Sequence, residues 1–113
     1  MDNEITIIVV VEYDHSGIKP VTYELLNAAR KLADKGNIIA LYFTDVENVD
    51  ESPLTHYGAD EIRICIHPAY HQYTHETYDA GLQSEIEKIQ PDIVLMPASN
   101  SGKELSAAVA TRL

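Results

Sequence analysis

Several features that identify whole classes of protein are absent or scarce in this sequence of 113 residues. It has one cysteine, Cys65, so no disulfide can form within the chain, and a reducing cytoplasm is the simplest expected setting. Apolar runs such as Ile7 to Val11 are far shorter than the roughly 20 residues of a membrane-spanning helix. The opening residues, Met1 to Glu4, contain no basic group, unlike a signal or transit peptide.

Basic residues are also scarce, and this scarcity excludes a second group of functions. Eight Lys and Arg side chains stand against eighteen Asp and Glu side chains, which gives a formal net charge of -10. Proteins that bind nucleic acids neutralise phosphates with clustered basic residues, and no basic stripe occurs along this chain. Nucleic acids and anionic membranes are therefore not expected partners, whereas a less acidic protein partner remains open.

The sequence does contain a regular alternation of strand-like and helical patterns. The strand-like runs are Ile5 to Val11, Ile38 to Phe43, Glu61 to Ile66 and Asp92 to Met96. Helical patterns begin at Lys19-Pro20 and near Thr74, and we expect the first to end at Gly36-Asn37 and the second at Ile89. The irregular, acidic stretch from Thr44 to Tyr57 predicts a loop with one helical turn.

The spacing of apolar residues predicts which helix faces meet the sheet. The expected buried positions are Leu25, Leu26, Ala29, Leu32 and Ala33 in the first helix, Tyr78, Leu82, Ile86 and Ile89 in the second, and Leu105, Ala108, Val109 and Leu113 in a third after the last strand.

Strands that alternate with helices predict a three-layer α/β domain with a mostly parallel open sheet. With strands numbered along the chain, we expect the order 3-2-1-4. The third strand alternates charged or small residues with isoleucine, so one of its faces should be solvent-exposed, as suits an edge. The fourth strand is apolar, and an apolar edge is normally covered. We therefore expect residues 1–113 to be a single domain whose last strand or strands are missing.

The turn after the fourth strand resembles a phosphate-binding loop, but it departs from that motif at two fixed positions. Gly102-Lys103 fits the motif, whereas Pro97 replaces a glycine and Glu104 replaces the hydroxyl that binds magnesium. A looser anion site made by Ser99, Ser101 and Gly102 remains open, because a helix N-terminus attracts negative groups. Ser101 and Glu104 also form a capping-box pattern, which is the more common use of such residues and is the interpretation we prefer.

Three histidines could in principle bind a metal. His67, His71 and His75 are spaced by four residues, but Pro68 disfavours one helix through all three and no further ligand completes a set. We predict no metal site.

Other reactive side chains give no catalytic pattern. Cys65 is expected to be a small packed side chain, and no serine nucleophile motif is present, so we predict no catalytic residues. Asp14 and His15 follow the first strand, where doubly wound folds bind ligands, but position alone supports them. Tyr70, Tyr73 and Tyr78 either form an interface patch or lie half-buried with solvated hydroxyls, and we favour the second alternative.

Five segments, in order, resemble the N-terminal domain of the alpha subunit of electron transfer flavoproteins. The first four are Ile8 to Glu12, Lys19 to Arg30, Tyr57 to Asp60 and Pro91 to Met96. The fifth lies between Ser99 and Leu113, where the matching residues are Ser99, Ser101, Gly102, Lys103-Glu104-Leu105 and Ala110-Thr111-Arg112-Leu113. The resemblance runs nearly from end to end, although the stretch from Val46 to His56 looks shorter than its counterpart in the family.

This resemblance implies a Rossmann-like fold of the adenine-nucleotide alpha-hydrolase type and a role in electron transfer. The full subunit would pair with a beta subunit and carry FAD, chiefly in a C-terminal domain absent here. It would pass electrons from flavin dehydrogenases to an acceptor, as an electron carrier rather than an enzyme. No FAD-binding residue is expected within these 113 residues. The alternatives are a free-standing nucleotide-binding module, for which the turn after strand four is poor in glycine, and a module that dimerises through its fourth strand.

The capping interpretation can be tested by substitution. Glu104→Ala should lower the free energy of unfolding by roughly 0.5–1 kcal/mol, because the reciprocal capping bond is lost. Chemical denaturation measures the change. A neutral or stabilising result would instead favour the anion site.

Overall fold

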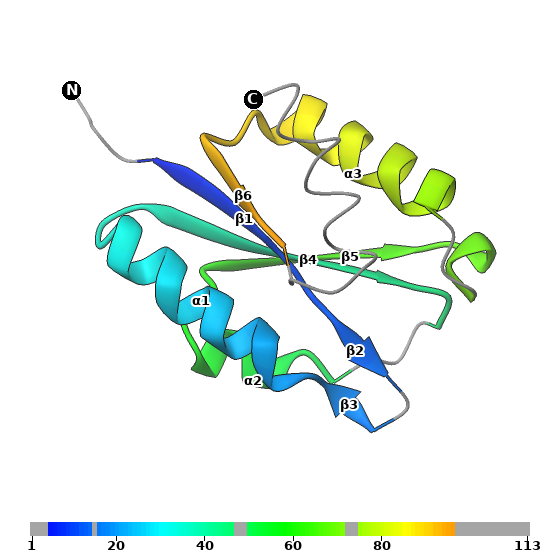
Figure 1. Cartoon of the computed structure of the whole chain (residues 1–113), viewed down its shortest axis with the longest axis horizontal. Helices are drawn as coiled ribbons and strands as arrows, with labels where there is room; N and C mark the ends of the chain where they lie inside the picture. Colours follow the sequence, from blue (N-terminus) through cyan, green and yellow to red (C-terminus); the bar gives the residue numbers. More distant parts are fainter. Residues whose placement is uncertain (1–4, 15, 47–49, 72–74, 97–113) are drawn as a thin grey trace.

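The computed structural model describes residues 5–14, 16–46, 50–71 and 75–96. Its main sheet has the order β5-β4-β1-β6, with every neighbouring pair parallel (Figure 1). The strands are β1 (Thr6–Val10), β4 (Asn37–Thr44), β5 (Glu61–Ile66) and β6 (Ile93–Leu95). The predicted order is therefore confirmed, with the first strand central and the third and fourth at the edges of the described sheet.

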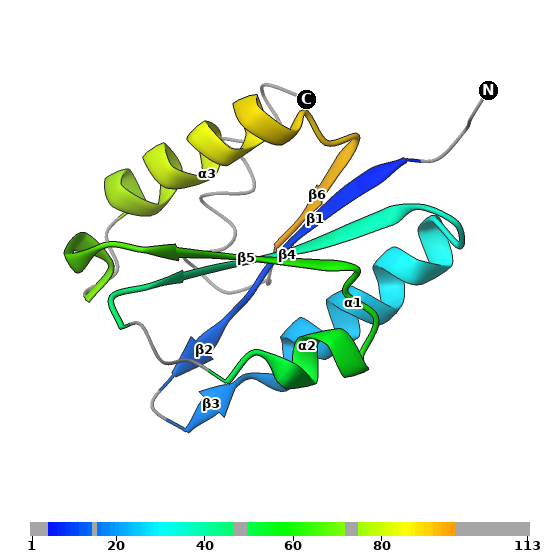
Figure 2. The same cartoon turned by 180° about the vertical axis from the view of Figure 1, so that it is seen from behind.

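Helices cover both faces of this sheet, which gives the predicted three layers. Helices α1 (Pro20–Leu32) and α2 (Ser52–His56) lie on one face, and α3 (His75–Ile89) lies on the other (Figure 2). A short 3-10 helix, η1 (Pro68–His71), lies between β5 and α3 along the chain. The single helical turn expected between Thr44 and Tyr57 is α2. None of the helices in the described ranges is long and apolar enough to cross a membrane.

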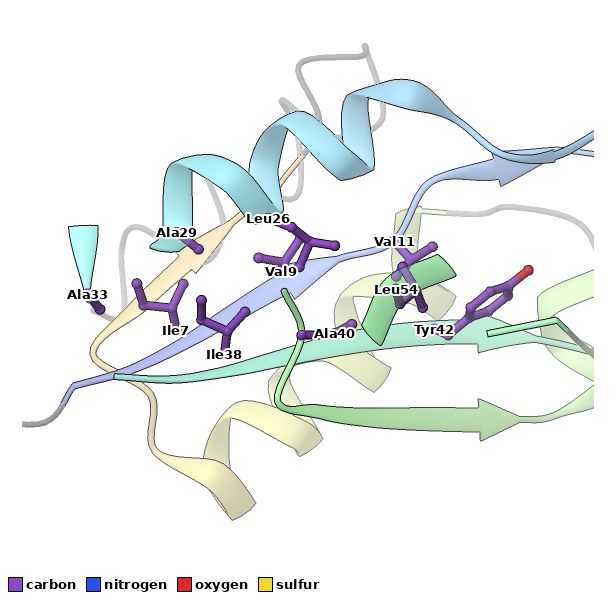
Figure 3. Packing of buried hydrophobic residues seen from close by; sticks show 11 residues of the cluster. Ile7, Val9, Val11, Leu26, Ala29, Ala33, Ile38, Ala40, Tyr42 and Leu54 are labelled. Carbon is purple, nitrogen blue, oxygen red and sulfur yellow. The ribbon is translucent and has the colours of Figure 1, made fainter. Parts of the chain in front are cut away.

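The two faces of β1 supply two separate hydrophobic clusters. Ile7 and Val9 point toward α1, where Leu26 and Ala29 lie against them (Figure 3). Ile8 and Val10 belong to the cluster beneath α3, which also contains Leu82 and Ile86 of the predicted helix face. A strand buried on both faces needs a continuous apolar run, which is why Ile7 to Val11 shows no alternation.

Helix α1 ends earlier than the sequence predicts. It stops at Leu32, with Ala33 at the C-cap, rather than at Gly36. Leu32 is consequently 58% exposed, so its assignment to the buried face is wrong, whereas Thr22 is fully buried. Gly36 allows the chain to pass close to Ile5 and Ala33, because a Cβ at this position would lie 2.5 Å from the Ile5 carbonyl oxygen and 2.6 Å from the Ala33 Cβ.

A small antiparallel hairpin between β1 and α1 was not predicted. Strands β2 (Tyr13–Asp14) and β3 (Gly17–Ile18) pair Tyr13 with Ile18 and Asp14 with Gly17. Gly17 has a φ of 121°, a conformation that favours glycine. The hairpin projects beyond the carboxyl end of the main sheet (Figure 1).

The face of the third strand that was expected to be solvent-exposed is exposed only in part, at Glu61. Arg63 and Cys65 are only partly exposed, because α3 packs across that face of β5. Arg63 donates from Nε to Glu85 of α3 at 2.6 Å, and Glu85 is buried. This ion pair neutralises the charge of Arg63, so that the arginine can lie beneath α3.

Arg30 joins the end of α1 to the turn before β5. Its Nη2 donates to the Gly58 carbonyl oxygen at 2.9 Å and to Asp60 Oδ2 at 2.8 Å. The same Asp60 oxygen accepts the backbone N–H of Ile38 at 2.9 Å, at the start of β4. Arg30 Nη1 also donates to the Gly36 carbonyl oxygen at 3.2 Å. One guanidinium thus connects α1, β4 and the turn into β5; we call this the arginine clamp.

Arg30→Ala should lower the free energy of unfolding by about 1–2 kcal/mol, because several carbonyl groups and one carboxylate lose their donor. Lys31→Ala is the matched control, since Lys31 is exposed and should change stability by no more than about 0.5 kcal/mol. Urea denaturation of both variants measures the difference. Equal losses in the two variants would show that the clamp contributes nothing.

Candidate functional site at the carboxyl end of the sheet

Open parallel sheets bind ligands beyond the carboxyl ends of their strands, so the groups at the end of β1 are candidates for a binding site. The peptide of Glu12 is held by α1: Thr22 Oγ1 accepts the Glu12 N–H at 2.9 Å and donates to the Glu12 carbonyl oxygen at 3.1 Å. Lys19 N–H also donates to that oxygen, and Lys19 Nζ lies 3.3 Å from Glu12 Oε2. These groups bond to one another, so they anchor the first turn of α1 to β1.

The neighbouring strand end is covered by the hairpin. Tyr13 donates its hydroxyl to the Phe43 carbonyl oxygen at 2.7 Å. Its ring lies on that of Tyr42, with centroids 4.7 Å apart. Ile18, the hairpin partner of Tyr13, packs against the same hydrophobic cluster. Tyr13 therefore covers the carboxyl end of β4.

Further aromatic groups gather beside this contact. Tyr23 of α1 stacks on Tyr57, which follows α2, with centroids 4.1 Å apart and planes inclined by 22°. Tyr57 is 43% exposed, whereas Tyr42 is 5% exposed. Figure 3 shows the Tyr42 ring beside Leu54, with its hydroxyl directed away from the core. We call Tyr13, Tyr23, Tyr42, Tyr57 and Asp50 the tyrosine cluster.

Burial and neighbouring groups shift the pKa values of three members of the tyrosine cluster, Tyr23, Tyr42 and Asp50. Burial raises the pKa of Tyr42, and the nearby Tyr13, Asp50 and Tyr23 raise it further. Burial, Tyr57 and Asp50 likewise raise the pKa of Tyr23. The hydroxyl and N–H of Ser52 donate to Asp50 Oδ1 at 2.6 and 3.3 Å, and these bonds lower the pKa of Asp50. At neutral pH Tyr23 and Tyr42 are therefore neutral phenols and Asp50 is a carboxylate.

The anion-site candidates Ser99, Ser101 and Gly102, together with the capping pattern at Glu104, lie outside the described residues. The same is true of His15 and Tyr73 and of the third expected helix. Asp14 is exposed, and its Oδ1 accepts the Ser16 N–H at 2.8 Å within the hairpin turn. Asp14 therefore stabilises the hairpin turn.

The histidines do not share one helix. His67 precedes η1, His71 ends it and His75 begins α3. Across the ranges that the structure describes, no group of three or more His, Cys, Asp or Glu residues could hold a metal ion.

Cys65 is a packed side chain, as predicted. It lies against the cluster formed by Phe43, Leu82 and Ile86, and burial followed by the charge of Glu85 raises its thiol pKa. Tyr70 packs on Phe43 with centroids 5.2 Å apart. Tyr70 is thus partly buried, whereas Tyr73 and the side chain of Tyr78 lie outside the described residues.

Sequence reasoning missed the tyrosine cluster, although a signal was present. Seven tyrosines in 113 residues is a high number, and Tyr13 and Tyr42 each stand near the end of an apolar run. The tyrosines singled out from the sequence, Tyr70, Tyr73 and Tyr78, belong to a different part of the chain. The buried Glu85 and the arginine clamp were also missed, because they depend on contacts between distant segments.

Two phenol-to-phenyl substitutions should differ in their effect on stability. Tyr13→Phe should lower the free energy of unfolding by about 0.5–1.5 kcal/mol, since the bond to the Phe43 carbonyl oxygen is lost. Tyr42→Phe should be neutral or stabilising, because the Tyr42 hydroxyl makes no hydrogen bond to any residue in the described part of the chain. Urea denaturation compares them. Equal destabilisation would mean that the Tyr42 hydroxyl has a partner.

Comparison with known proteins gives a consistent result. The family model described as "Electron transfer flavoprotein domain" matches residues 7–113. Protein FixB of Azorhizobium caulinodans is 31% identical over 112 residues, covering 93% of this chain and 30% of that protein. The electron transfer flavoprotein subunit alpha of Bacillus subtilis is 30% identical over 107 residues, covering 95% of this chain and 33% of that protein.

Another relative is named as part of a larger enzyme. Subunit LctC of the lactate dehydrogenase (NAD(+),ferredoxin) of Acetobacterium woodii is 36% identical over 110 residues, covering 94% of this chain and 26% of LctC. The chain thus spans a third or less of the length of these relatives. The resemblance to alpha subunits found in the sequence is confirmed, and the chain belongs to the electron transfer flavoprotein domain family.

Proposed function

We propose that this chain is the N-terminal scaffold domain of an alpha-type electron transfer flavoprotein subunit. In this proposal the domain acts as part of an electron carrier rather than as an enzyme. FAD is held mainly by a domain outside residues 1–113, and it supplies the redox chemistry.

The observation that carries this proposal is that side chains of the family-like segments form hydrogen bonds between different structural elements. Arg30 of the first-helix segment contacts Gly58 and Asp60 of the turn segment. Asp92, in the segment that contains β6, accepts the Thr6 N–H on Oδ2 at 2.8 Å at the start of β1. Side chains that make the segments recognisable thus connect one element to another, as a scaffold requires.

Glu12 and Thr22 give a third example of the same use. The end of the opening strand is bonded to the first helix through these two residues. The three contacts are separate, and they lie at different places along the sheet rather than around one ligand position.

The described residues at the carboxyl end of the sheet do not fit the pyrophosphate of FAD. A pyrophosphate needs free backbone donors or basic side chains. The Glu12 N–H is already bonded to Thr22, and the ionised Asp50 would repel phosphate. We therefore derive no flavin step through these residues. Ser99, Ser101 and Gly102 remain the anion-site candidates of the proposal.

The names of the relatives support a heteromeric assembly. We propose that the partner is a beta subunit, that flavin dehydrogenases supply electrons to the assembled carrier, and that the protein is cytoplasmic. The names "subunit alpha" and "subunit LctC" support the assembly, since a subunit implies a complex. The single Cys65, with burial raising its pKa, is compatible with a reducing compartment.

FAD at about 100 µM should not raise the melting temperature of this chain, because the flavin contacts lie elsewhere. A dissociation constant ten times lower than that concentration would stabilise the fold by about 1.4 kcal/mol, which thermal denaturation detects. Riboflavin, which lacks the pyrophosphate, is the matched control. A saturable increase with FAD alone would contradict the placement of the flavin site.

A further inference from the structure

The hairpin formed by β2 and β3 is attached to the rest of the fold at a fixed point on each side. On the side before it, the Glu12 peptide is held to α1 by two hydrogen bonds with Thr22 Oγ1. On the side after it, the Lys19 N–H donates to the Glu12 carbonyl oxygen at 2.8 Å. The Lys19 carbonyl oxygen accepts the Thr22 N–H at 3.0 Å. Glu12 and Lys19 are therefore bonded to each other and to α1, whatever the position of the hairpin between them.

The hairpin is too small to fix its own position over the sheet. Its two strands have two residues each, and a short hairpin is at best marginally stable by itself in water. Asp14, Ser16 and Gly17 are exposed. Tyr13 and Ile18 are the described hairpin residues that pack against the hydrophobic cluster beneath α1. The position of the hairpin therefore depends on these two side chains.

Tyr13 holds the hairpin against the end of β4. Its hydroxyl donates to the Phe43 carbonyl oxygen at 2.7 Å, and its ring lies on the Tyr42 ring with centroids 4.7 Å apart. Tyr42 is 5% exposed, and Figure 3 shows its ring beside Leu54 of α2. Movement of Tyr13 away from β4 would therefore uncover one side of the Tyr42 ring and the Phe43 carbonyl oxygen.

Such a movement would leave the core of the domain intact. Ile7, Ile8 and Val9 of β1 are fully buried by other elements, and Tyr13 and Ile18 are only partly buried. Segments with few buried contacts open locally at a lower free energy than the whole domain. The hairpin projects beyond the carboxyl end of the sheet, so that it can move without displacing a strand (Figure 1).

We propose that the hairpin is a strap over the carboxyl end of β4, which opens as one unit about Glu12 and Lys19 while the sheet stays folded. The Tyr13 hydroxyl bond keeps the strap closed. Opening exposes the Tyr42 ring and the Phe43 carbonyl oxygen to solvent. This proposal goes beyond the scaffold role and is independent of the flavin.

The test measures the rate at which tetranitromethane nitrates each tyrosine ring, by mass spectrometry of peptides. All proteins carry Cys65→Ala, because the reagent also oxidises thiols. Tyr57 is 43% exposed and should react fast, whereas Tyr42 should react slowly, in proportion to the open population. Urea well below the unfolding midpoint should leave the Tyr42 rate nearly unchanged, because opening of the strap exposes little surface.

Two variants weaken the closed strap, and one matched control weakens the fold elsewhere. Tyr13→Phe should raise the Tyr42 nitration rate about two- to tenfold without changing the Tyr57 rate, since the closed form loses one hydrogen bond. Ile18→Ala should also raise the Tyr42 rate, since the closed form loses apolar packing. Arg30→Ala removes contacts near the other end of α1 and should leave the Tyr42 rate unchanged.

Three outcomes would overturn the proposal. The first is a Tyr42 rate that rises with urea in proportion to the unfolded fraction, which would mean that the ring is reached only by global unfolding. The second is an equal increase in Tyr13→Phe and Arg30→Ala. The third is a Tyr42 rate that neither Tyr13→Phe nor Ile18→Ala changes, because the hairpin would then not control access to the ring.

Discussion

The rest of the structure depends on the burial of β1 on both faces. Ile7, Ile8 and Val9 have no exposed surface, and each such side chain contributes about 1.5–3 kcal/mol when it leaves water. A strand buried in this way must have neighbours on both sides and helices above and below. The positions of β4, β6, α1 and α3 all satisfy that requirement. Hydrophobic burial therefore sets the layers, but it does not set their register.

Register comes from a few polar contacts at the ends of the strands. Asp92 fixes β6 against the start of β1, Thr22 fixes α1 against its end, and Arg30 fixes α1 against β4 and the turn into β5. Each contact joins segments that are distant in sequence, and each uses a backbone group as well as a side chain. Substituting such a residue would leave a backbone donor or acceptor unpaired, which gives these positions a structural importance without any ligand. In this part of the chain, residues of the family-like segments make all of these contacts.

The sequence predicted the sheet order because strand environment leaves a clear pattern. A continuous β-branched run at Ile7 to Val11 indicates a central strand, and alternation at Glu61 to Ile66 indicates an edge. The same alternation did not predict how much of that face is covered, since Glu85 supplies a buried partner that no local pattern reveals. The two-residue strands of the hairpin are too short to show any period. The early end of α1 was missed because Gly36 looked like a helix terminator, whereas its role is a close approach to Ile5.

The candidate site was less predictable than the fold. The four tyrosines of the cluster come from the hairpin, α1, β4 and the end of α2, and only the folded chain brings them together. Tyr42 lies within an apolar run and looked like one more core residue. What marks it is the missing hydrogen-bond partner of its hydroxyl, and hydrogen bonds to distant segments leave no trace in composition or spacing.

A double-mutant cycle on Arg30 and Asp60 tests the central claim most directly, namely that the residues of the family-like segments act by joining structural elements. Free energies of unfolding are measured for the unsubstituted chain, Arg30→Ala, Asp60→Ala and the double variant. The account predicts a favourable coupling energy of about 1 kcal/mol or more between the two side chains. Effects that add to within about 0.3–0.5 kcal/mol would contradict it, because the two segments would then contribute to stability independently.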